Sequence, residues 1–107
     1  MTDELTARLR RLLSVLKECG DQFALNLVDD ALAAPEATQD QFLVSNALWG
    51  GAGSIADQAG IDGGRVVRRR VEQALIDLGE EQVRSGKLNI RTASWVDVFR
   101  VWKRDAV

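Results

Sequence analysis

The segment Gly50-Gly51-Ala52-Gly53-Ser54 is the part of the sequence whose backbone could bind an anion or a small molecule directly. Glycines let a ligand approach the main chain, and backbone N–H groups are common anion donors. The spacing of Gly51, Gly53 and Ala56 matches a dinucleotide-binding pattern, but that site needs a preceding strand, and a P-loop needs a lysine. Here a capped helix is predicted before the segment, and no lysine follows it.

Two interpretations of this glycine-rich segment therefore remain. In the first, it is a tight connection between helices, and Ser54 caps the next turn. In the second, it is a loop that binds a small molecule or an anion in a nest of backbone N–H groups. The residues that would form this ligand loop are Trp49, Gly50, Gly51, Gly53, Ser54 and Asp57.

Catalytic side chains are sparse, because the chain contains no histidine and a single cysteine. Without imidazole, Ser-His-Asp and Cys-His triads are excluded, as are zinc sites that need a histidine ligand. Ser54 has no nearby base to activate its hydroxyl, and Cys19 is expected to be a small core residue. Asp29 and Asp30 would point about 100° apart on a helix and so do not form a metal pair. We expect no catalytic residue, no metal, no cofactor and no enzymatic activity.

Charge is unevenly distributed along the 107 residues, although the net charge is only −2. Residues 18–64 contain eight carboxylates and no lysine or arginine, whereas the segments on both sides are net basic. One interpretation is that the basic terminal helices neutralise these carboxylates within the protein. The other is that the middle of the chain presents an acidic face that attracts a basic protein. The residues expected to contact such a partner are Asp29, Asp30, Glu36 and Asp40.

Four of the six residues from 65 to 70 are arginine, which makes this the basic cluster of the chain. On a helix, an outer strip is predicted from Arg65, Arg68, Arg69 and Glu72. The sequence pI of about 5.1 is far below the values typical of nucleic-acid-binding domains, so nucleic acid is not expected as a partner. The cluster could instead be a solvated face, or it could complement the acidic segment, either within one chain or between two copies in a homodimer.

Hydrophobic periodicity predicts helices over residues 3–19 and 22–33. Thr2 and Asp21 are suitable N-caps, and Gly20 can end the first helix in the left-handed conformation. The buried stripe of the first helix is predicted to consist of Leu5, Leu9, Leu12, Leu13 and Leu16. The residues of the second helix predicted to face inward are Phe23, Ala24, Leu27, Val28, Ala31 and Leu32.

The rest of the chain predicts three further helices and one short turn. A helix capped by Thr38 should run to Trp49, and a turn capped by Ser54 should span residues 55–59. A long helix is predicted over residues 65–85, followed by a helix over residues 93–105.

Within the long helix, pairs at i,i+4 should lie on the solvated side: Arg68 with Glu72, and Glu80 with Arg84. The last helix should be capped by Thr92 or Ser94. Its inner stripe is predicted to be Trp95, Val98, Phe99 and Trp102. The predicted fold is all-α, a single-domain bundle over residues 1–107 with about five helices and a glycine-rich connection in the middle.

The run from Leu48 to Asp57 resembles the signature of a bacterial family of uncharacterised small domains, an aromatic residue followed by Gly-Gly-x-Gly-Ser, an apolar residue and Asn-Asp. The matching residues are Trp49, Gly50, Gly51, Gly53, Ser54, Ile55 and Asp57. Ala52 and Ala56 stand where methionine and asparagine are common, so the polar neighbour of Asp57 is missing. The resemblance implies no established activity, although some members are thought to be immunity-like proteins of bacterial toxin systems.

These features predict a non-enzymatic module that binds another protein, with a basic toxin domain as one partner that its acidic segment would occlude. The alternative is a small-molecule or anion-binding domain that uses the glycine-rich loop. No apolar run approaches the roughly 18 residues of a membrane span, and the polar N-terminus is unlike a signal peptide. Because a lone cysteine also favours a reducing compartment, we expect a cytoplasmic protein with no membrane partner.

Overall fold

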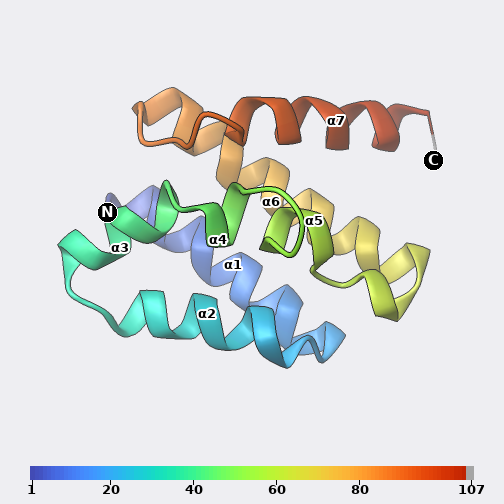
Figure 1. The fold of residues 1–107 in the computed structure, drawn as a ribbon, viewed down its shortest axis with the longest axis horizontal. Helices are drawn as coiled ribbons and strands as arrows, with labels where there is room; N and C mark the ends of the chain where they lie inside the picture. Colours follow the sequence, from blue (N-terminus) through green and yellow to red (C-terminus); the bar gives the residue numbers. More distant parts are fainter. Residues whose placement is uncertain (106–107) are drawn as a thin grey trace.

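The computed structural model describes residues 1–105, and every regular element among them is a helix (Figure 1). The elements of eight residues or more are α1 (Asp3–Cys19), α2 (Gln22–Ala33), α3 (Glu36–Leu43), α6 (Arg65–Ser85) and α7 (Thr92–Arg104). Shorter elements are α4 (Asn46–Trp49), α5 (Ile55–Gln58) and the 3₁₀ turn η1 (Ile61–Gly63). The prediction of an all-α fold is confirmed for the described residues, and residues 50–54 connect α4 to α5.

The first two helices begin and end as their capping residues predict. The Thr2 hydroxyl accepts the N–H of Leu5 at 3.2 Å, and Asp21 Oδ1 accepts the N–H of Ala24 at 3.1 Å. Between them, Gly20 has a φ of 74°, in the left-handed region that a residue with a side chain rarely adopts. These caps satisfy backbone groups that a helix leaves unpaired at its ends.

The single helix predicted from Thr38 to Trp49 is divided into α3 and α4. The capping role of Thr38 is wrong, because α3 already begins at Glu36 and Thr38 is exposed on its surface. Pro35 starts the helix instead, with a φ of −58° that suits the entry into a helix. The helix is then interrupted, and Ser45 caps α4, where its hydroxyl accepts the N–H of Leu48 at 3.4 Å.

The long helices pack in the order α2, α1, α6 and α7, so that α1 and α6 form the middle of the molecule (Figure 1). In Figure 1, α7 lies above this pair, α2 lies below it, and the two run along opposite sides of the molecule. The predicted stripe of α1 is buried except for Leu13, which is partly buried. The α6 residues that complete this core are Val71, Ala74, Leu75, Ile76 and Leu78.

A buried polar contact joins α3, α4 and α6 at the centre of the core. Trp49 is 0% exposed, and its Nε1 donates to Gln82 Oε1 at 2.8 Å. Gln82 Nε2 donates in turn to the carbonyl oxygens of Leu43 at 2.7 Å and Lys87 at 2.8 Å. Gly79 permits this approach, because a Cβ there would lie 3.1 Å from the Trp49 ring. The indole and the amide therefore fix how the ends of three helices meet.

The aromatic stripe predicted for α7 is present, but it is rotated toward Val96. Phe99 is buried and stacks on Trp95 with ring centroids 5.4 Å apart, and Trp102 lies 5.9 Å from Phe99. Val98 is 37% exposed, whereas Val96 is 2% exposed. The inward position predicted for Val98 is therefore wrong, because the stripe follows the direction set by Phe99 and Val96.

The N-terminus of α7 also differs from the prediction. The helix begins at Thr92, and Arg91 occupies the N-cap position without a side-chain hydrogen bond. The Thr92 hydroxyl accepts the N–H of Asn89, at 3.0 Å, and so supports the preceding loop rather than the helix. Neither Thr92 nor Ser94 is the cap, since the buried Thr92 hydroxyl satisfies a loop donor.

Candidate protein-binding surface

The outer face of α2 carries the two adjacent carboxylates predicted to contact a partner. Ala24, Val28 and Ala31 are buried, and α2 packs on α1, so the opposite side of the helix faces solvent. We call its exposed residues the acidic strip: Gln22, Phe23, Asn26, Asp29, Asp30 and Ala33. Among residues 1–105, neither Asp29 nor Asp30 has an ion-pair partner; the paired carboxylates of the cation-free segment are Glu18, Glu36 and Asp40.

Phe23 is the large apolar side chain of the acidic strip, and its position was not predicted. It is 71% exposed, whereas the sequence pattern placed it in the core. That expectation is wrong because Ala24 lies on the buried side of α2, and adjacent residues on a helix point about 100° apart. Phe23 lines a shallow pocket of about 290 Å³ together with Gly53, Gln58 and Asp62. An exposed aromatic ring thus lies at the end of a strip that has no cation.

Asp21 holds the start of α2 against the segment that follows α5. One carboxylate oxygen caps α2 through Ala24, and the other accepts the N–H of Gly60 at 3.1 Å. Gly60 has a φ of 77°, and a Cβ there would lie 2.7 Å from a methyl carbon of Val71, so a side chain is excluded. These contacts fix the start of α2 to the segment that follows α5, and both of these parts line the pocket beside Phe23.

Glu36 and Asp40, the other two residues predicted to contact a partner, lie on α3. Asp40 Oδ2 is 3.0 Å from Lys87 Nζ, and this hydrogen bond lowers the pKa of Asp40. Glu36 is exposed and lies 3.3 Å from the amino group of Met1. The structure therefore separates the four carboxylates into two pairs. Glu36 and Asp40 each lie beside a cation, whereas among the described residues Asp29 and Asp30 have no counter-charge.

Several hydrogen bonds of the glycine-rich segment are made within the chain. The Ser54 hydroxyl donates to the carbonyl of Gly50 at 3.1 Å and accepts the N–H of Asp57 at 3.2 Å, which confirms Ser54 as the cap of α5. The N–H of Gly53, a residue with a φ of 86°, donates to Asp57 Oδ2 at 3.0 Å. The carboxylate of Asp57 thus already accepts one of the loop N–H groups that an external anion could use.

Trp49 does not line an open ligand site, which corrects this part of the predicted ligand loop, and Ser54 contributes only to the wall of the shallow pocket beside Phe23. Trp49 has no exposed surface, and Ser54 is 4% exposed. Trp95 Nε1 donates to the carbonyl oxygens of Trp49 and Gly50, both at 3.1 Å, and so fixes the start of the loop from inside. Of residues 50–54, only Gly51, Ala52 and Gly53 are exposed.

The anchor at Asp57 makes the stability of this loop depend on pH. Hydrogen bonds from Gln58 and from the N–H of Gly53 lower the pKa of Asp57. A carboxyl with a folded pKa below its unfolded value of about 3.9 stabilises the fold above that pH, and this contribution is lost as the pH falls through the folded pKa. We expect Asp57→Asn to lower the free energy of unfolding by about 1 kcal/mol at neutral pH and by less below about pH 4.

Urea unfolding of both proteins at about pH 7, 5 and 3 measures this effect, because the difference between them isolates Asp57 from the other carboxylates. Ser94→Ala, which changes an exposed residue of α7, serves as a control with no expected pH dependence. A deficit of Asp57→Asn that is the same at all three pH values would contradict the role given to the charged carboxylate.

The outer strip predicted on α6 is interrupted, because Arg68 and Glu72 point inward. The side chains of Arg68 and Glu72 are 12% and 7% exposed, and Arg68 Nε lies 3.0 Å from Glu72 Oε2. The guanidinium also donates to the carbonyl oxygens of Ala56 and Ala59 at the end of α5, and it lies 5.4 Å from the Phe99 ring centroid. The prediction that this pair lies on the solvated side is therefore wrong, because the Arg68 guanidinium donates hydrogen bonds to carbonyl oxygens at the end of α5.

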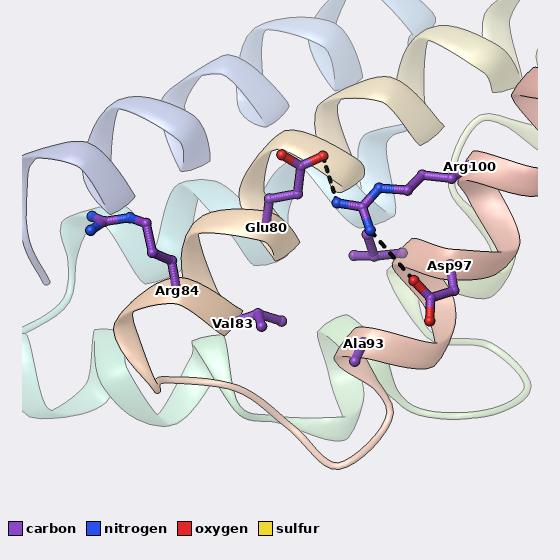
Figure 2. Close-up of a pocket in the computed structure, with 7 residues that line it drawn as sticks. Glu80, Val83, Arg84, Ala93, Asp97 and Arg100 are labelled. Atoms are coloured by element: carbon purple, nitrogen blue, oxygen red, sulfur yellow. Dashed lines mark hydrogen bonds and ion pairs between the residues drawn. The ribbon is translucent and has the colours of Figure 1, made fainter.

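A second pocket of about 360 Å³ lies between α6 and α7 (Figure 2). Figure 2 shows Arg100 between two carboxylates, 2.9 Å from Glu80 and 3.4 Å from Asp97. Arg84 points away from this group and pairs with Glu81. The predicted pair of Glu80 with Arg84 is wrong, because α7 supplies a cation that sequence spacing within α6 does not reveal. The charged rim of this pocket is neutralised by its own residues.

Cys19 is the partly buried last residue of α1. Burial raises the pKa of its thiol, which keeps the sulfur protonated at neutral pH. Its partial burial against the core agrees with the small core residue that the sequence predicts. A protonated, partly covered thiol has little nucleophilic character.

Comparison with protein-family models, with curated proteins and with solved structures finds no match to this chain. The resemblance of residues 48–57 to a family of small domains therefore stays a prediction. Within residues 1–105, no helix combines the length and apolar character needed to cross a membrane. The same residues contain no group of three histidine, cysteine, aspartate or glutamate side chains placed to hold a metal.

Proposed function

We propose that this protein is a non-enzymatic module that binds a basic protein through the acidic strip of α2. The observation that carries the proposal is the exposure of Phe23, at 71%, on the same helix face as two carboxylates without a counter-charge in the described chain. Phe23 and Asp30 are seven residues apart, about 10.5 Å along one side of a helix. The strip therefore offers one apolar anchor and one anionic end.

Each part of the strip has a physical role in recognition. Aromatic side chains are frequent anchors of protein interfaces, and the face of a Phe ring attracts lysine or arginine within about 6 Å. The carboxylates of Asp29 and Asp30 raise the rate at which a cationic surface meets the strip. A partner with an arginine or lysine beside an apolar residue would match both features. A basic toxin domain, which the family resemblance suggests, is one such partner, and the module would block it by occlusion.

An arginine-rich peptide of about 12 residues serves as the probe for this proposal, because its chemistry is that of the expected partner. We expect Asp29→Lys with Asp30→Lys to weaken peptide binding at least about tenfold at low salt, since two attractive contacts become repulsive. The matched control is Asp97→Lys with Asp105→Lys, which changes the net charge equally on α7 and at its C-cap, on the other side of the molecule (Figure 1). Fluorescence anisotropy of a labelled peptide gives the dissociation constants.

Phe23→Ala separates the aromatic contact from the charges. Because Phe23 is exposed, we expect its removal to weaken the peptide complex about fivefold or more while leaving the melting temperature nearly unchanged. Equal loss of binding in the α2 variant and in the α7 control would mean that net charge alone attracts the peptide, and the acidic strip would then not be the binding surface.

A further inference from the structure

We infer that a second copy of this chain can occupy the acidic strip and that it contributes the first turns of its α6. This inference rests on the proposed function of the acidic strip and names a partner for it. We call the complementary surface the basic strip; its residues are Arg65, Val66, Arg69, Gln73 and Lys103.

The basic strip combines an exposed apolar side chain with cations. Val66 is 76% exposed, and with Arg65 and Arg69 it lines an open depression of about 450 Å³ on α6. Lys103 of α7 reaches this surface, because its Nζ donates to Gln73 Oε1 at 2.6 Å. Both strips therefore combine an exposed apolar side chain with charged groups. The charges are positive in the basic strip and negative in the acidic strip.

Three arginines of α6 already lie close to carboxylates of the same chain, so the charge contact of the inference rests on Arg65 and Lys103. Arg70 pairs with Glu18 of α1, and Arg68 is bound to Glu72 inside the protein. Arg69 lies 3.8 Å from the other oxygen of Glu72. By contrast, Arg65 and Lys103 form no ion pair with the described residues, so their charges are available to a second molecule.

The two strips also share one spacing. Phe23 and Asp30 are separated by seven residues on α2, and Val66 and Gln73 are separated by seven residues on α6, about 10.5 Å in each helix. When Phe23 lies on Val66 and the aliphatic part of Arg65, Asp30 lies opposite Gln73 and the ammonium group of Lys103. The apolar contact and the charge contact can therefore form together in a single register.

The arrangement of the helices decides what kind of assembly results. α1 packs against both α2 and α6 and lies between them, so the two strips of one chain face different directions (Figure 1). The contact is then heterologous, and each bound copy leaves one strip open for the next. Because each strip is short and its charges are exposed, association should be weak and should decrease as salt increases.

Sedimentation velocity with two charge-reversed variants tests this inference. One variant carries Asp29→Lys and Asp30→Lys, and the other carries Arg65→Glu and Lys103→Glu. We expect the sedimentation coefficient of the wild type to rise with concentration at about 10 mM salt and to fall to the monomer value at about 500 mM salt. Each variant alone should stay monomeric, since its two strips carry the same sign of charge.

Mixing the variants is the decisive step, because both strips of one variant are then complementary to both strips of the other. We expect the mixture to recover salt-sensitive association, with far-UV circular dichroism confirming that each variant is folded. A wild type that stays monomeric, or a mixture that does not associate, would overturn the inference. The arginine-rich peptide distinguishes the two claims: binding of the peptide by a monomeric wild type rejects the second copy and keeps the proposed function, whereas no peptide binding rejects both.

Discussion

We expect Trp49→Ala to lower the free energy of unfolding by about 3–5 kcal/mol, which is the range for removal of a fully buried aromatic side chain. Trp49 has no exposed surface and lies among α3, α4 and α6. The substitution creates a cavity at the point where three helix ends meet. It also removes the N–H group that Gln82 Oε1 accepts, and an orphaned buried acceptor costs roughly a further 1–3 kcal/mol unless water reaches it.

Two control variants separate these contributions. Trp49→Phe keeps most of the apolar volume but removes the indole N–H, so it should cost less than Trp49→Ala and report mainly on Gln82. Trp102→Ala changes a tryptophan that is only partly buried, and it should cost less than Trp49→Ala. Urea unfolding followed by far-UV circular dichroism measures all three variants. A loss below about 1 kcal/mol for Trp49→Ala would contradict the central packing position of the indole.

Arg68→Ala is the second change with a large expected effect, about 3–5 kcal/mol, because it leaves a buried carboxylate without its partner. Glu72 is 7% exposed, and burial already raises its pKa. The carbonyl oxygens of Ala56 and Ala59 lose their side-chain donors at the same time. We expect the segment from α5 to η1, and with it the pocket beside Phe23, to become less ordered.

The pH dependence of this variant follows from the sign of the Glu72 shift. A carboxyl whose folded pKa is raised takes up a proton on folding, so stability increases as the pH falls toward and below that pKa. The deficit of Arg68→Ala should therefore be largest at neutral pH and smaller in mild acid. Arg65→Ala, an exposed arginine of the same helix, is the control and should change stability by about 0.5 kcal/mol or less.

The double variant Arg68→Met with Glu72→Leu tests whether the unpaired carboxylate of Glu72 causes the loss of stability. Removal of both charges leaves no uncompensated ion, so this double variant should recover a large part of the lost stability. If Arg68→Ala is no more destabilising than Arg65→Ala, or if the double variant is worse than Arg68→Ala, the buried pair does not hold α5 in place.

The parts of the fold that depend on neighbouring residues were predictable from the sequence. The bounds of α2 and the caps Thr2, Asp21 and Ser54 follow from local hydrogen bonds and from the period of apolar residues. The break at Ser45 was missed because a serine inside an apolar pattern does not reveal on its own that a new helix begins there.

The parts that depend on distant contacts were not predictable in the same way. Arg68 turns inward because α5, which precedes it by about ten residues, presents carbonyl oxygens without donors. Asp40 is neutralised by Lys87, which is 47 positions away in the chain. Spacing along one helix cannot report such partners, so carboxylates that look equivalent in the sequence differ in the folded protein.

Sequence patterns indicate the charges of the candidate surface but not the surroundings of each residue. The cation-free segment includes Asp29 and Asp30, which have no ion-pair partner among residues 1–105, and also Asp40, which has its own cation. Phe23 was assigned to the core because it is apolar, although its neighbour Ala24 lies on the buried side of α2. A stricter use of helical phase, in which Ala24, Val28 and Ala31 define the buried side, places Phe23 about 100° away from that side rather than within it.

Backbone amide shifts measured by NMR during titration with the arginine-rich peptide test the acidic strip most directly, because they locate the contact residue by residue. We expect the largest changes to fall on residues 22–33 and around Asp62, and we expect Phe23→Ala to reduce them. Changes centred on α3, on α7 or on the α6–α7 pocket, or the absence of localised changes, would contradict the claim that α2 is where this protein binds its partner.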